Sequence, residues 1–348
     1  MSLCQPERLT RVTPRGERSY MRAILVREPG DESVLALGEV PSPPLGKADI
    51  RIRVRTTSVN RADLLQRQGL YPPPPGASPT LGLECAGEVV EIGPEARGFS
   101  LGQRVMALLP GGGYAEEAVV HYTAALAVPE SMSDEEAGAF PEVFFTAFSN
   151  LFMPGLGVLG PGERALVHGG GGGVGTAAIL LLREAGNPCV VTAGSDDKCR
   201  QCLALGATAA VNYRTEDFVA RARELSDGRG VDVVLDHIGA AYLAKNLAAL
   251  APGGRLVEIG LTGGARAELN LAELLVRRLA VIGSTLRGRS IAEKAKIVEG
   301  FRARFGAALA AHRLRPAIDR VLPLAQAAEA HRLMQANAHF GKIVLRVA

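Results

Sequence analysis

A short glycine motif is the clearest chemical signal in this 348-residue sequence. Three glycines follow the spacing Gly170-x-Gly172-x-x-Gly175, directly after an apolar strand-like run at 165–168 and before an apolar helical run at 174–185. The first glycine allows a tight turn, the second lets the backbone approach a diphosphate, and the third lets the helix pack on the strand. A flexible surface loop is the alternative. The flanking strand and helix favour a dinucleotide-binding turn, with phosphates at the helix N-terminus.

The end of the second strand indicates which dinucleotide binds. An NAD site places Asp or Glu about 20 residues after the glycines, whereas Gly194 and Ser195 stand there in this chain and Lys198 follows. A small residue, a hydroxyl and a cation suit a 2′-phosphate, so the sequence favours NADPH over NADH. Tyr213, after the third strand, either closes over the same phosphate or is a half-buried aromatic at a strand end.

Strand-like and helix-like runs alternate from residue 144 to residue 286. Short apolar runs, such as 190–193 and 231–236, are separated by helical runs of similar or greater length. One such helix is predicted at 215–225, with Thr215 as its N-cap. The alternation predicts βαβ crossovers and a parallel sheet covered on both faces, which is an α/β, doubly wound Rossmann domain.

The regions on either side of residues 144–286 have a different residue pattern. Residues 21–143 hold short β-rich runs interrupted by Pro and Gly, such as 50–57 with its alternating apolar positions, and predict a mostly β domain. Residues 287–348 are too few for a third domain, so we assign them to the β domain. Residues 1–20 carry four arginines without an apolar centre, and we expect a disordered extension there.

The composition excludes several functional classes. The 39 basic and 36 acidic residues leave a net charge of +3, which predicts no strong attraction to nucleic acid or to membranes. No apolar run approaches the roughly 18 residues of a membrane-spanning helix. Five cysteines are a sparse and odd count, so we expect a reducing compartment, the cytoplasm. The pair Cys199-x-x-Cys202 is interpreted as two small packed side chains, with reversible oxidation as the alternative.

Several longer stretches carry a family resemblance. They are 59–69 (VNRADLLQRQG), 82–89 (GLECAGEV), 112–116 (GGYAE), 284–287 (STLR) and 341–345 (GKIVL). Together with the glycine turn, they resemble the zinc-free branch of the medium-chain dehydrogenase/reductase superfamily. Within that branch the chain is similar to the NAD(P)H:quinone oxidoreductases of the p53-inducible subgroup.

The resemblance implies a domain arrangement and an assembly. A GroES-like catalytic domain would be built from 21–143 and 287–348, with the Rossmann domain at 144–286 between these segments. NADPH would lie in the cleft between the two domains. The chain would form a homodimer through the last Rossmann strand.

The resemblance also implies a set of NADPH contacts. They lie at Gly173, Val174, Ser195, Lys198 and Tyr213, with backbone contacts near Gly239, Leu261, Leu286, Phe340, Gly341 and Lys342. Relatives often carry Ala or Ser inside the glycine turn, where this chain has only glycine from 169 to 173. We therefore expect a looser turn here, which would change the affinity for phosphate but not the location of the phosphate site.

Metal binding and catalysis follow from the same resemblance. Zinc-dependent relatives carry Gly-His-Glu where this chain has Gly82-Leu83-Glu84, and Leu83 cannot bind a metal, so no metal site is expected. The implied catalytic residues are Tyr71 and Asn60, each a neutral hydrogen-bond donor to an oxygen where negative charge develops. Tyr71 as loop packing and Asn60 as a structural turn residue remain open as alternatives.

The expected function is transfer of reducing equivalents from NADPH to a small quinone, without zinc. Hydride comes from the cofactor, so the protein positions the donor and polarises the acceptor. One alternative is an NADPH-dependent reductase of enone or enoyl double bonds, which would differ only in pocket shape. The other is a non-catalytic NADPH-binding protein, which would bind NADPH without oxidising it. The short Tyr71 loop favours small quinones over large carriers.

Overall fold

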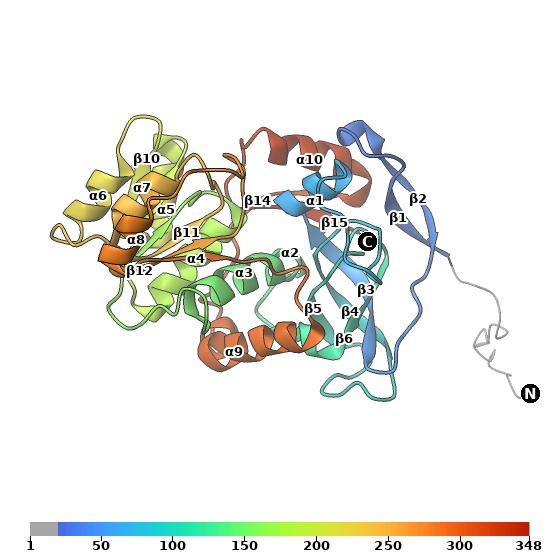
Figure 1. The fold of residues 1–348 in the computed structure, drawn as a ribbon. Helices are drawn as coiled ribbons and strands as arrows, with labels where there is room; N and C mark the ends of the chain where they lie inside the picture. The colour runs from blue at the N-terminus through green and yellow to red at the C-terminus, as the bar shows by residue number, and fades with distance from the viewer. Residues whose placement is uncertain (1–19, 348) are drawn as a thin grey trace, which may run out of the picture.

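Two large sheets and a two-stranded sheet of β1 and β2 organise the chain, and the computed structural model describes them over residues 20–347 (Figure 1). One sheet has seven strands in the order β14-β15-β3-β4-β5-β7, with β6 paired to β3. The other is a six-stranded parallel sheet in the order β10-β9-β8-β11-β12-β13. The predicted α/β class, with a mostly β part and a doubly wound part, is confirmed. The extension expected at residues 1–20 falls outside the described residues, except for Tyr20, which begins β1.

The β-rich part uses both ends of the chain. Its strands are β1 (Tyr20–Val26), β2 (Leu35–Pro41), β3 (Asp49–Ser58), β4 (Glu84–Ile92), β5 (Arg104–Leu108), β6 (Glu117–His121), β7 (Ala125–Ala127), β14 (Ile318–Pro323) and β15 (Lys342–Arg346). Its helices are α1 (Arg61–Arg67), α2 (Asp134–Gly138) and α10 (Ala327–Gln335). The strand β15 pairs antiparallel with β3, and Val344 lies opposite Ser58. This pairing brings the end of the chain beside the residues that follow β3.

The parallel sheet is built from alternating strands and helices. In chain order they are β8 (Ala165–Val167), α4 (Gly173–Ala185), β9 (Cys189–Ala193), α5 (Asp196–Leu205), β10 (Ala209–Asn212), α6 (Phe218–Glu224), β11 (Val231–Asp236), α7 (Leu243–Ala249), β12 (Leu250–Glu258), α8 (Leu271–Arg277) and β13 (Ala280–Gly283). Strand order reverses between β8 and β11. In open α/β sheets, ligands bind at the carboxyl ends of strands beside such a reversal. The glycine turn follows β8 at this point.

The start of α6 differs from the prediction. The helix expected from Thr215 begins at Phe218, and its N-cap is Asp217, whose carboxylate accepts from Val219 N at 3.1 Å. The residues before it form a turn because Asn212 N donates to the Glu216 carboxylate at 3.0 Å. Thr215 therefore lies in this turn and does not cap a helix. The boundaries predicted between the two domains stay a prediction.

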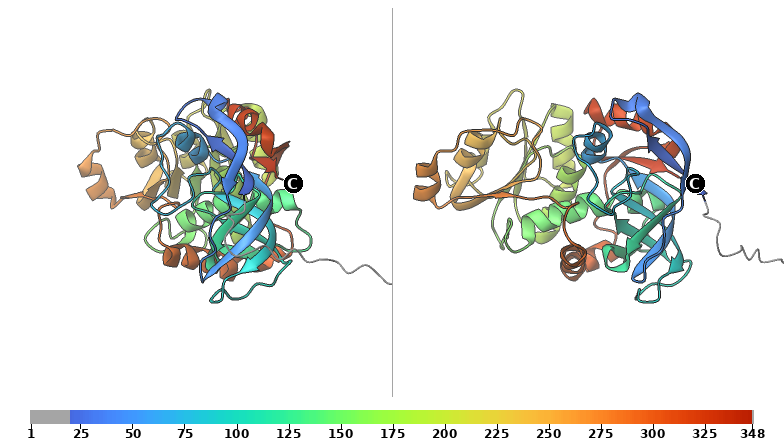
Figure 2. Two further views of the ribbon diagram at one scale, coloured as in Figure 1. Left: turned by 90° about the vertical axis from the view of Figure 1, so that its right-hand side faces the viewer. Right: turned by 45° about the vertical axis from the view of Figure 1, so that its right-hand side comes forward.

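Two helices join the parts: α3 (Pro141–Phe152) and α9 (Ile291–Ala310). Phe140 stacks on Phe144 with ring centroids 3.9 Å apart, and Phe301 of α9 meets Phe140 edge-on at 5.7 Å. Both helices lie where the two parts of the molecule meet (Figure 2). This aromatic core fixes the first turn of α3 at the junction of the two parts. Among the helices described between residues 20 and 347, none is long and apolar enough to cross a membrane.

Candidate nicotinamide dinucleotide site

The glycine turn ends in a helix N-terminus with free donors. Gly172 is the N-cap of α4, and the first helical bond runs from Thr176 N to Gly172 O at 2.9 Å. The N–H groups of Gly173, Val174 and Gly175 precede that bond and have no acceptor within the helix. They form, with the positive end of the helix dipole, a site that suits phosphate oxygens.

Close packing explains the glycines of this turn. A side chain at Gly175 would overlap the Gly169 carbonyl oxygen, and one at Gly170 would lie 2.8 Å from Val191 Cβ. Gly171 is also held, because its carbonyl accepts from Gly341 N at 2.8 Å. We expected this turn to be loose. It is instead packed against the parallel sheet on one side and hydrogen-bonded to Gly341 on the other.

The residues predicted for the 2′-phosphate lie together at the end of β9. A Cβ on Gly194 would stand 2.8 Å from the Tyr213 hydroxyl, so a side chain at this position would have to displace the tip of the Tyr213 ring. Ser195 is the N-cap of α5, and its Oγ accepts from Lys198 N at 3.3 Å. Tyr213 is 44% exposed, which leaves its ring free to close on a ligand.

Lys198 also reaches across the junction between the two parts. Its ammonium donates to the Asn337 carbonyl at 2.7 Å, and burial lowers its pKa. Asn337 adopts a left-handed φ of 53° and accepts from Arg61 of α1 through its side-chain oxygen. A 2′-phosphate bound at Ser195 would thus compete with Asn337 for the Lys198 ammonium.

The other predicted contacts lie in three places. Gly239 and Leu261 lie together, since a Cβ on Gly239 would stand 2.9 Å from Leu261 Cδ2, and Leu261 is 56% exposed. Phe340 N donates to the Asp319 carboxylate at 3.0 Å, so this N–H is occupied within the protein. Leu286 is buried in the apolar core that α3, α4 and α9 share.

A buried ionic cluster lies beside the first turn of α4. The Lys342 ammonium donates to Asn60 Oδ1 at 2.6 Å, to Glu84 Oε1 at 2.9 Å and to the Val59 carbonyl at 3.1 Å. Glu84 Oε1 also accepts from Asn60 Nδ2 at 2.8 Å. A Cβ on Gly173 would stand 2.7 Å from Lys342 Cδ, so the cluster and the glycine turn are in contact. Lys342 was predicted as a backbone contact, but its side chain forms the centre of this cluster.

Asn60, the N-cap of α1, binds different partners through its backbone and through its side chain. Its backbone N–H donates to the Asp63 carboxylate at 2.8 Å, while its side chain binds the Lys342–Glu84 pair. Desolvation raises the pKa of the buried Asp63 to about 6. One Asn60 amide hydrogen goes to Glu84, and the second is free to donate elsewhere.

Tyr71 is held at the edge of this region by Arg287. The guanidinium of Arg287 lies 5.4 Å from the centroid of the Tyr71 ring and donates to the Tyr71 carbonyl at 3.2 Å. It also donates to the Gln66 side-chain oxygen and to the Pro110 carbonyl. One buried arginine therefore holds the loop that carries Tyr71 in place. Burial raises the pKa of Tyr71, and Glu142 contributes in the same direction.

Sequence reasoning missed four charged residues of this region: Glu84, Glu142, Arg287 and Lys294. Glu84 and Arg287 stood in the stretches that carry the resemblance, but nothing local indicated their contacts. Lys294 of α9 is buried and donates to the Arg287 carbonyl at 2.8 Å. Glu142 looked like an ordinary acid in the first turn of a helix.

The cluster does not fit a zinc ion. Leu83 is buried where a histidine ligand would be needed, and the Lys342 ammonium already neutralises the Glu84 carboxylate. An ammonium within 3 Å of that carboxylate would repel a divalent cation bound there. Across the residues that the structure describes, no three His, Cys, Asp or Glu side chains are grouped to hold a metal.

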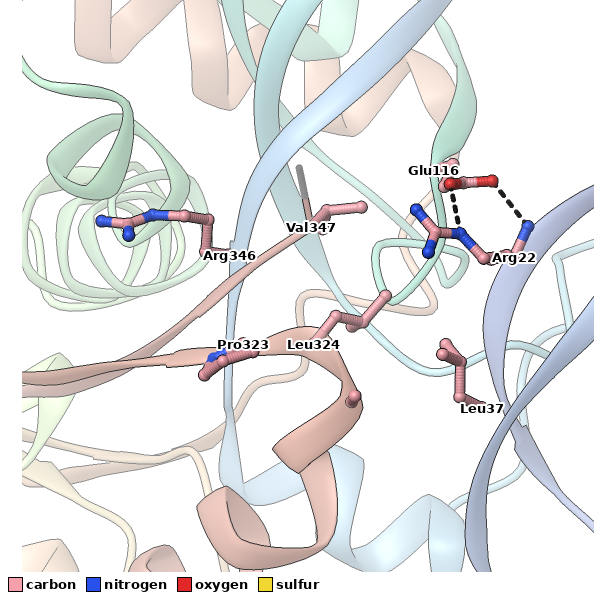
Figure 3. A pocket seen from close by; sticks show the side chains of 8 residues that line it. Arg22, Leu37, Glu116, Pro323, Leu324, Arg346 and Val347 are labelled. Atoms are coloured by element: carbon pink, nitrogen blue, oxygen red, sulfur yellow. Dashed lines mark hydrogen bonds and ion pairs between the residues drawn. The ribbon is translucent and has the colours of Figure 1, made fainter.

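A surface pocket lies elsewhere in the β-rich part (Figure 3). Its lining includes Arg22, which pairs with Glu116 at 2.7 Å, together with Leu324 and Val347. None of the residues predicted for cofactor or substrate lines it. We therefore do not assign the candidate site to this pocket.

Comparisons with known proteins agree with this architecture. The family described as "Alcohol dehydrogenase GroES-like domain" matches residues 46–130, and the one described as "Zinc-binding dehydrogenase" matches residues 205–345. The human synaptic vesicle membrane protein VAT-1 homolog is 34% identical over 91% of this chain and 84% of its own length. A phenolphthiocerol/phthiocerol polyketide synthase of Mycobacterium tuberculosis is 34% identical over 92% of this chain, which spans only 14% of that protein.

Solved structures with the same fold include two quinone oxidoreductases. That of Pseudomonas syringae has a TM-score of 0.83 and 29% identity, covering 94% of this chain and 100% of the other. That of Escherichia coli, solved with NADPH, has a TM-score of 0.81 and 26% identity, with coverage of 94% and 100%. The predicted GroES-like and Rossmann domains and the resemblance are confirmed. The chain belongs to the medium-chain dehydrogenase/reductase family.

Proposed function

We propose that this chain is a zinc-independent NADPH:quinone oxidoreductase acting on a small quinone between its two domains. The observation that carries the proposal is the Lys342–Asn60–Glu84 cluster, which lies against the dinucleotide turn where related dehydrogenases would need metal ligands. The likeness to two quinone oxidoreductase structures supports the same substrate class.

The choice of NADPH rests on the end of β9. Gly194 supplies no carboxylate to bind a ribose 2′-hydroxyl, and Ser195 and Lys198 supply a hydroxyl and a cation there. Tyr213 can cover the phosphate from the open side. The glycine turn, with Gly170, Gly172 and the N–H groups after it, would hold the diphosphate, and Gly239, Leu261 and residues 340–342 would line the rest of the cofactor.

The bound cofactor supplies the hydride, and the protein supplies orientation and hydrogen bonds. Tyr71 is placed by Arg287 and offers a neutral hydroxyl, while Asn60 offers its second amide hydrogen. Two neutral donors stabilise the negative charge that develops on a quinone oxygen. A permanently charged group in their place would bind the product equally well. Tyr71 and Asn60 are therefore the proposed catalytic residues.

Reduction of an enone or enoyl double bond is the second candidate. The 34% identity with part of a polyketide synthase favours it. It needs the same cofactor and the same placement of donors. The substrate oxygen would then belong to a conjugated carbonyl.

NADPH oxidation followed at 340 nm separates these functions. The panel contains 1,4-benzoquinone, 1,2-naphthoquinone, an alkenal and an enoyl thioester, each also tested with NADH. Consumption that is fast only with the quinones is the expected result. Faster consumption with the alkenal or thioester would replace the quinone proposal by the second candidate. Tight NADPH binding without turnover on any acceptor would identify a non-catalytic NADPH-binding protein.

We also propose that the chain forms a homodimer through β13. This strand is one of the two edges of the parallel sheet, and the adjacent α8 exposes Leu271, Leu275 and Val276 by 68%, 78% and 71%. A two-fold axis would pair β13 with the same strand of a second copy, antiparallel, and would cover these side chains. Apolar side chains gathered at a free sheet edge are typical of an interface.

A reducing compartment, the cytoplasm, is the location that we propose. The four described cysteines, Cys85, Cys189, Cys199 and Cys202, are buried and free. Burial raises the pKa of Cys202 to about 12, which keeps it in the unreactive thiol form. This supports the interpretation of the Cys199–Cys202 pair as packed side chains.

A further inference from the structure

The loop between α10 and β15 lies between the start of α1 and the glycine turn. On one side, Val59 N donates to the Ile343 carbonyl at 2.9 Å, just before α1 begins. On the other side, Gly341 N donates to the Gly171 carbonyl at 2.8 Å. Residues 336–341 are therefore held against both parts of the molecule, beside the turn proposed to bind the diphosphate.

Two cations, one from each part of the molecule, meet on this loop at Asn337. Arg61 is the first residue of α1, and its guanidinium donates to Asn337 Oδ1 at 2.5 Å. The Lys198 ammonium of α5 donates to the Asn337 carbonyl at 2.7 Å. Asn337 is exposed and has a left-handed φ of 53°, a conformation that asparagine adopts more readily than most residues. One neutral residue therefore holds two positive charges together.

These two cations are not neutralised by an acid of the protein. Within residues 20–347, neither Arg61 nor Lys198 forms an ion pair with a carboxylate. Asp319 influences the pKa of Lys198. Its carboxylate, however, pairs with Arg320 at 2.7 Å and accepts from Phe340 N at 3.0 Å. Two positive charges that share only neutral oxygens at an exposed loop favour an anion as their ligand.

The place where the cations meet indicates which anion they would bind. Ser195 follows β9, and its Oγ accepts from Lys198 N at 3.3 Å. The Lys198 side chain therefore starts at the end of the second strand of the dinucleotide fold, where the 2′-position of the ribose lies. The hydrogen bonds through Lys198 and Asn337 bring Arg61 to this same strand end.

We propose that Arg61 is a second cation for the 2′-phosphate of NADPH and determines cofactor specificity together with Lys198. The inference rests on the proposed function, in which NADPH is the cofactor. A phosphate dianion is a stronger acceptor for both cations than the neutral oxygens of Asn337, and a guanidinium can donate two parallel hydrogen bonds to it. NADH has no such phosphate and would leave both cations on Asn337. The β-rich part of the chain would thereby take part in the choice of cofactor.

The variant Arg61→Gln tests this role by calorimetric titration of the cofactor-free protein with NADPH and with NADH. We expect the Kd for NADPH to rise about 10- to 150-fold, as for a lost charged hydrogen bond, and the Kd for NADH to stay close to the wild-type value. Arg200→Gln is the control, because Arg200 is 70% exposed and pairs with Asp197 of its own helix. It should leave both constants unchanged. Equal losses for the two cofactors in Arg61→Gln would overturn the inference.

A double variant separates a direct contact from an effect that passes through Lys198. In the Lys198→Gln background, Arg61→Gln should raise the Kd for NADPH further, because the phosphate still has the guanidinium to lose. An unchanged Kd would mean that Arg61 only positions Lys198 by way of Asn337, and the direct contact would be wrong.

A readout on the wild type does not depend on the folding of Arg61→Gln. Adenosine 2′,5′-bisphosphate and AMP are the probes, and they differ only in the 2′-phosphate. The Nε–H resonance of Arg61, assigned by its absence from Arg61→Lys, should shift on titration with the bisphosphate and not with AMP. A resonance that does not respond to the bisphosphate would overturn the inference.

The outcomes distinguish this inference from the proposed function. A wild type that binds NADPH and NADH equally would overturn the choice of NADPH, and the role of Arg61 with it. A preference for NADPH that persists undiminished in Arg61→Gln would overturn the role of Arg61 alone. Quinone turnover is measured separately, so its absence would overturn the proposed substrate while the two Kd values still decide on Arg61.

Discussion

The Lys342 ammonium lies 2.9 Å from a carboxylate oxygen of Glu84, although the two residues are 258 positions apart in the sequence. Both side chains are almost fully buried, at 2% and 0% exposure. Lys342 begins β15 and Glu84 begins β4, and both strands flank β3 in the sheet. The ion pair therefore links β15, the last strand of the chain, to β4. It also places the Asn60 side chain between the two charges.

Replacing Lys342 by Met should destabilise the protein by about 3–5 kcal/mol, because the Glu84 carboxylate would be left buried without a cation. Urea unfolding of the cofactor-free protein measures this loss. The double variant Lys342→Met/Glu84→Gln should recover most of it, since neither member of the pair then carries a charge. A loss below about 1 kcal/mol in the single variant would contradict the assigned role of the pair.

Replacing Lys198 by Glu should weaken NADPH binding much more than NADH binding. A charged hydrogen bond contributes about 1.5–3 kcal/mol, which corresponds to a roughly 10- to 150-fold increase in the Kd for NADPH. Titration of intrinsic tyrosine or cofactor fluorescence gives both constants. Lys296→Glu, on the exposed side of α9, is the matched charge control. Equal losses for the two cofactors would show that Lys198 does not bind the 2′-phosphate.

Replacing Tyr71 by Phe should lower kcat with quinones about 10²-fold, as expected for a lost donor to a developing oxyanion. The ring remains, so its stacking on Arg287 and the fold of the loop should persist. The Kd for NADPH should stay within about two-fold of wild type, because the hydroxyl is assigned to the substrate. Steady-state kinetics and cofactor titration check both points, with Tyr20→Phe as control. Full activity in Tyr71→Phe would identify Tyr71 as loop packing.

Replacing Leu275 by Glu should convert the proposed homodimer into monomers. Leu275 is 78% exposed on α8, so the change should cost the monomer itself only about 0.5 kcal/mol. Light scattering after size exclusion gives the mass. Leu203→Glu, on the exposed face of α5, should leave the mass unchanged. A wild type that is already monomeric at micromolar concentration would remove the dimer from consideration.

Local signals made much of the fold predictable. The glycine turn was found because its spacing and its flanking elements lie within about 20 residues of sequence. Gly194 was recognised by its distance from that turn, and in the structure it lies beside the Tyr213 hydroxyl. Thr215 failed as an N-cap because Asp217 offers a better-placed carboxylate, and propensity alone does not rank two nearby caps.

Long-range contacts could not be predicted in the same way. The roles of Lys342 and Glu84 depend on a strand pairing between the two ends of the chain, and no spacing rule connects them. Glu142 resembles any acid in a first helical turn, which the helix dipole favours. Its raised pKa arises in the folded state, first from burial and then from the nearby carboxylates of Glu84 and Asp63.

The raised pKa of Glu142 predicts a pH-dependent difference in stability. A carboxyl group whose pKa is about 8 when folded and about 4.5 when unfolded stabilises the fold fully below pH 4.5. That contribution is lost as pH rises through 8. Glu142→Gln removes the loss, so the Tm of the variant relative to wild type should increase from pH 5 to pH 9. Calorimetry of the cofactor-free proteins measures it. Glu135→Gln should show a constant difference above pH 6, because Arg346 lowers the pKa of Glu135. A pH-independent difference for Glu142→Gln would mean that the carboxyl group is ionised at neutral pH.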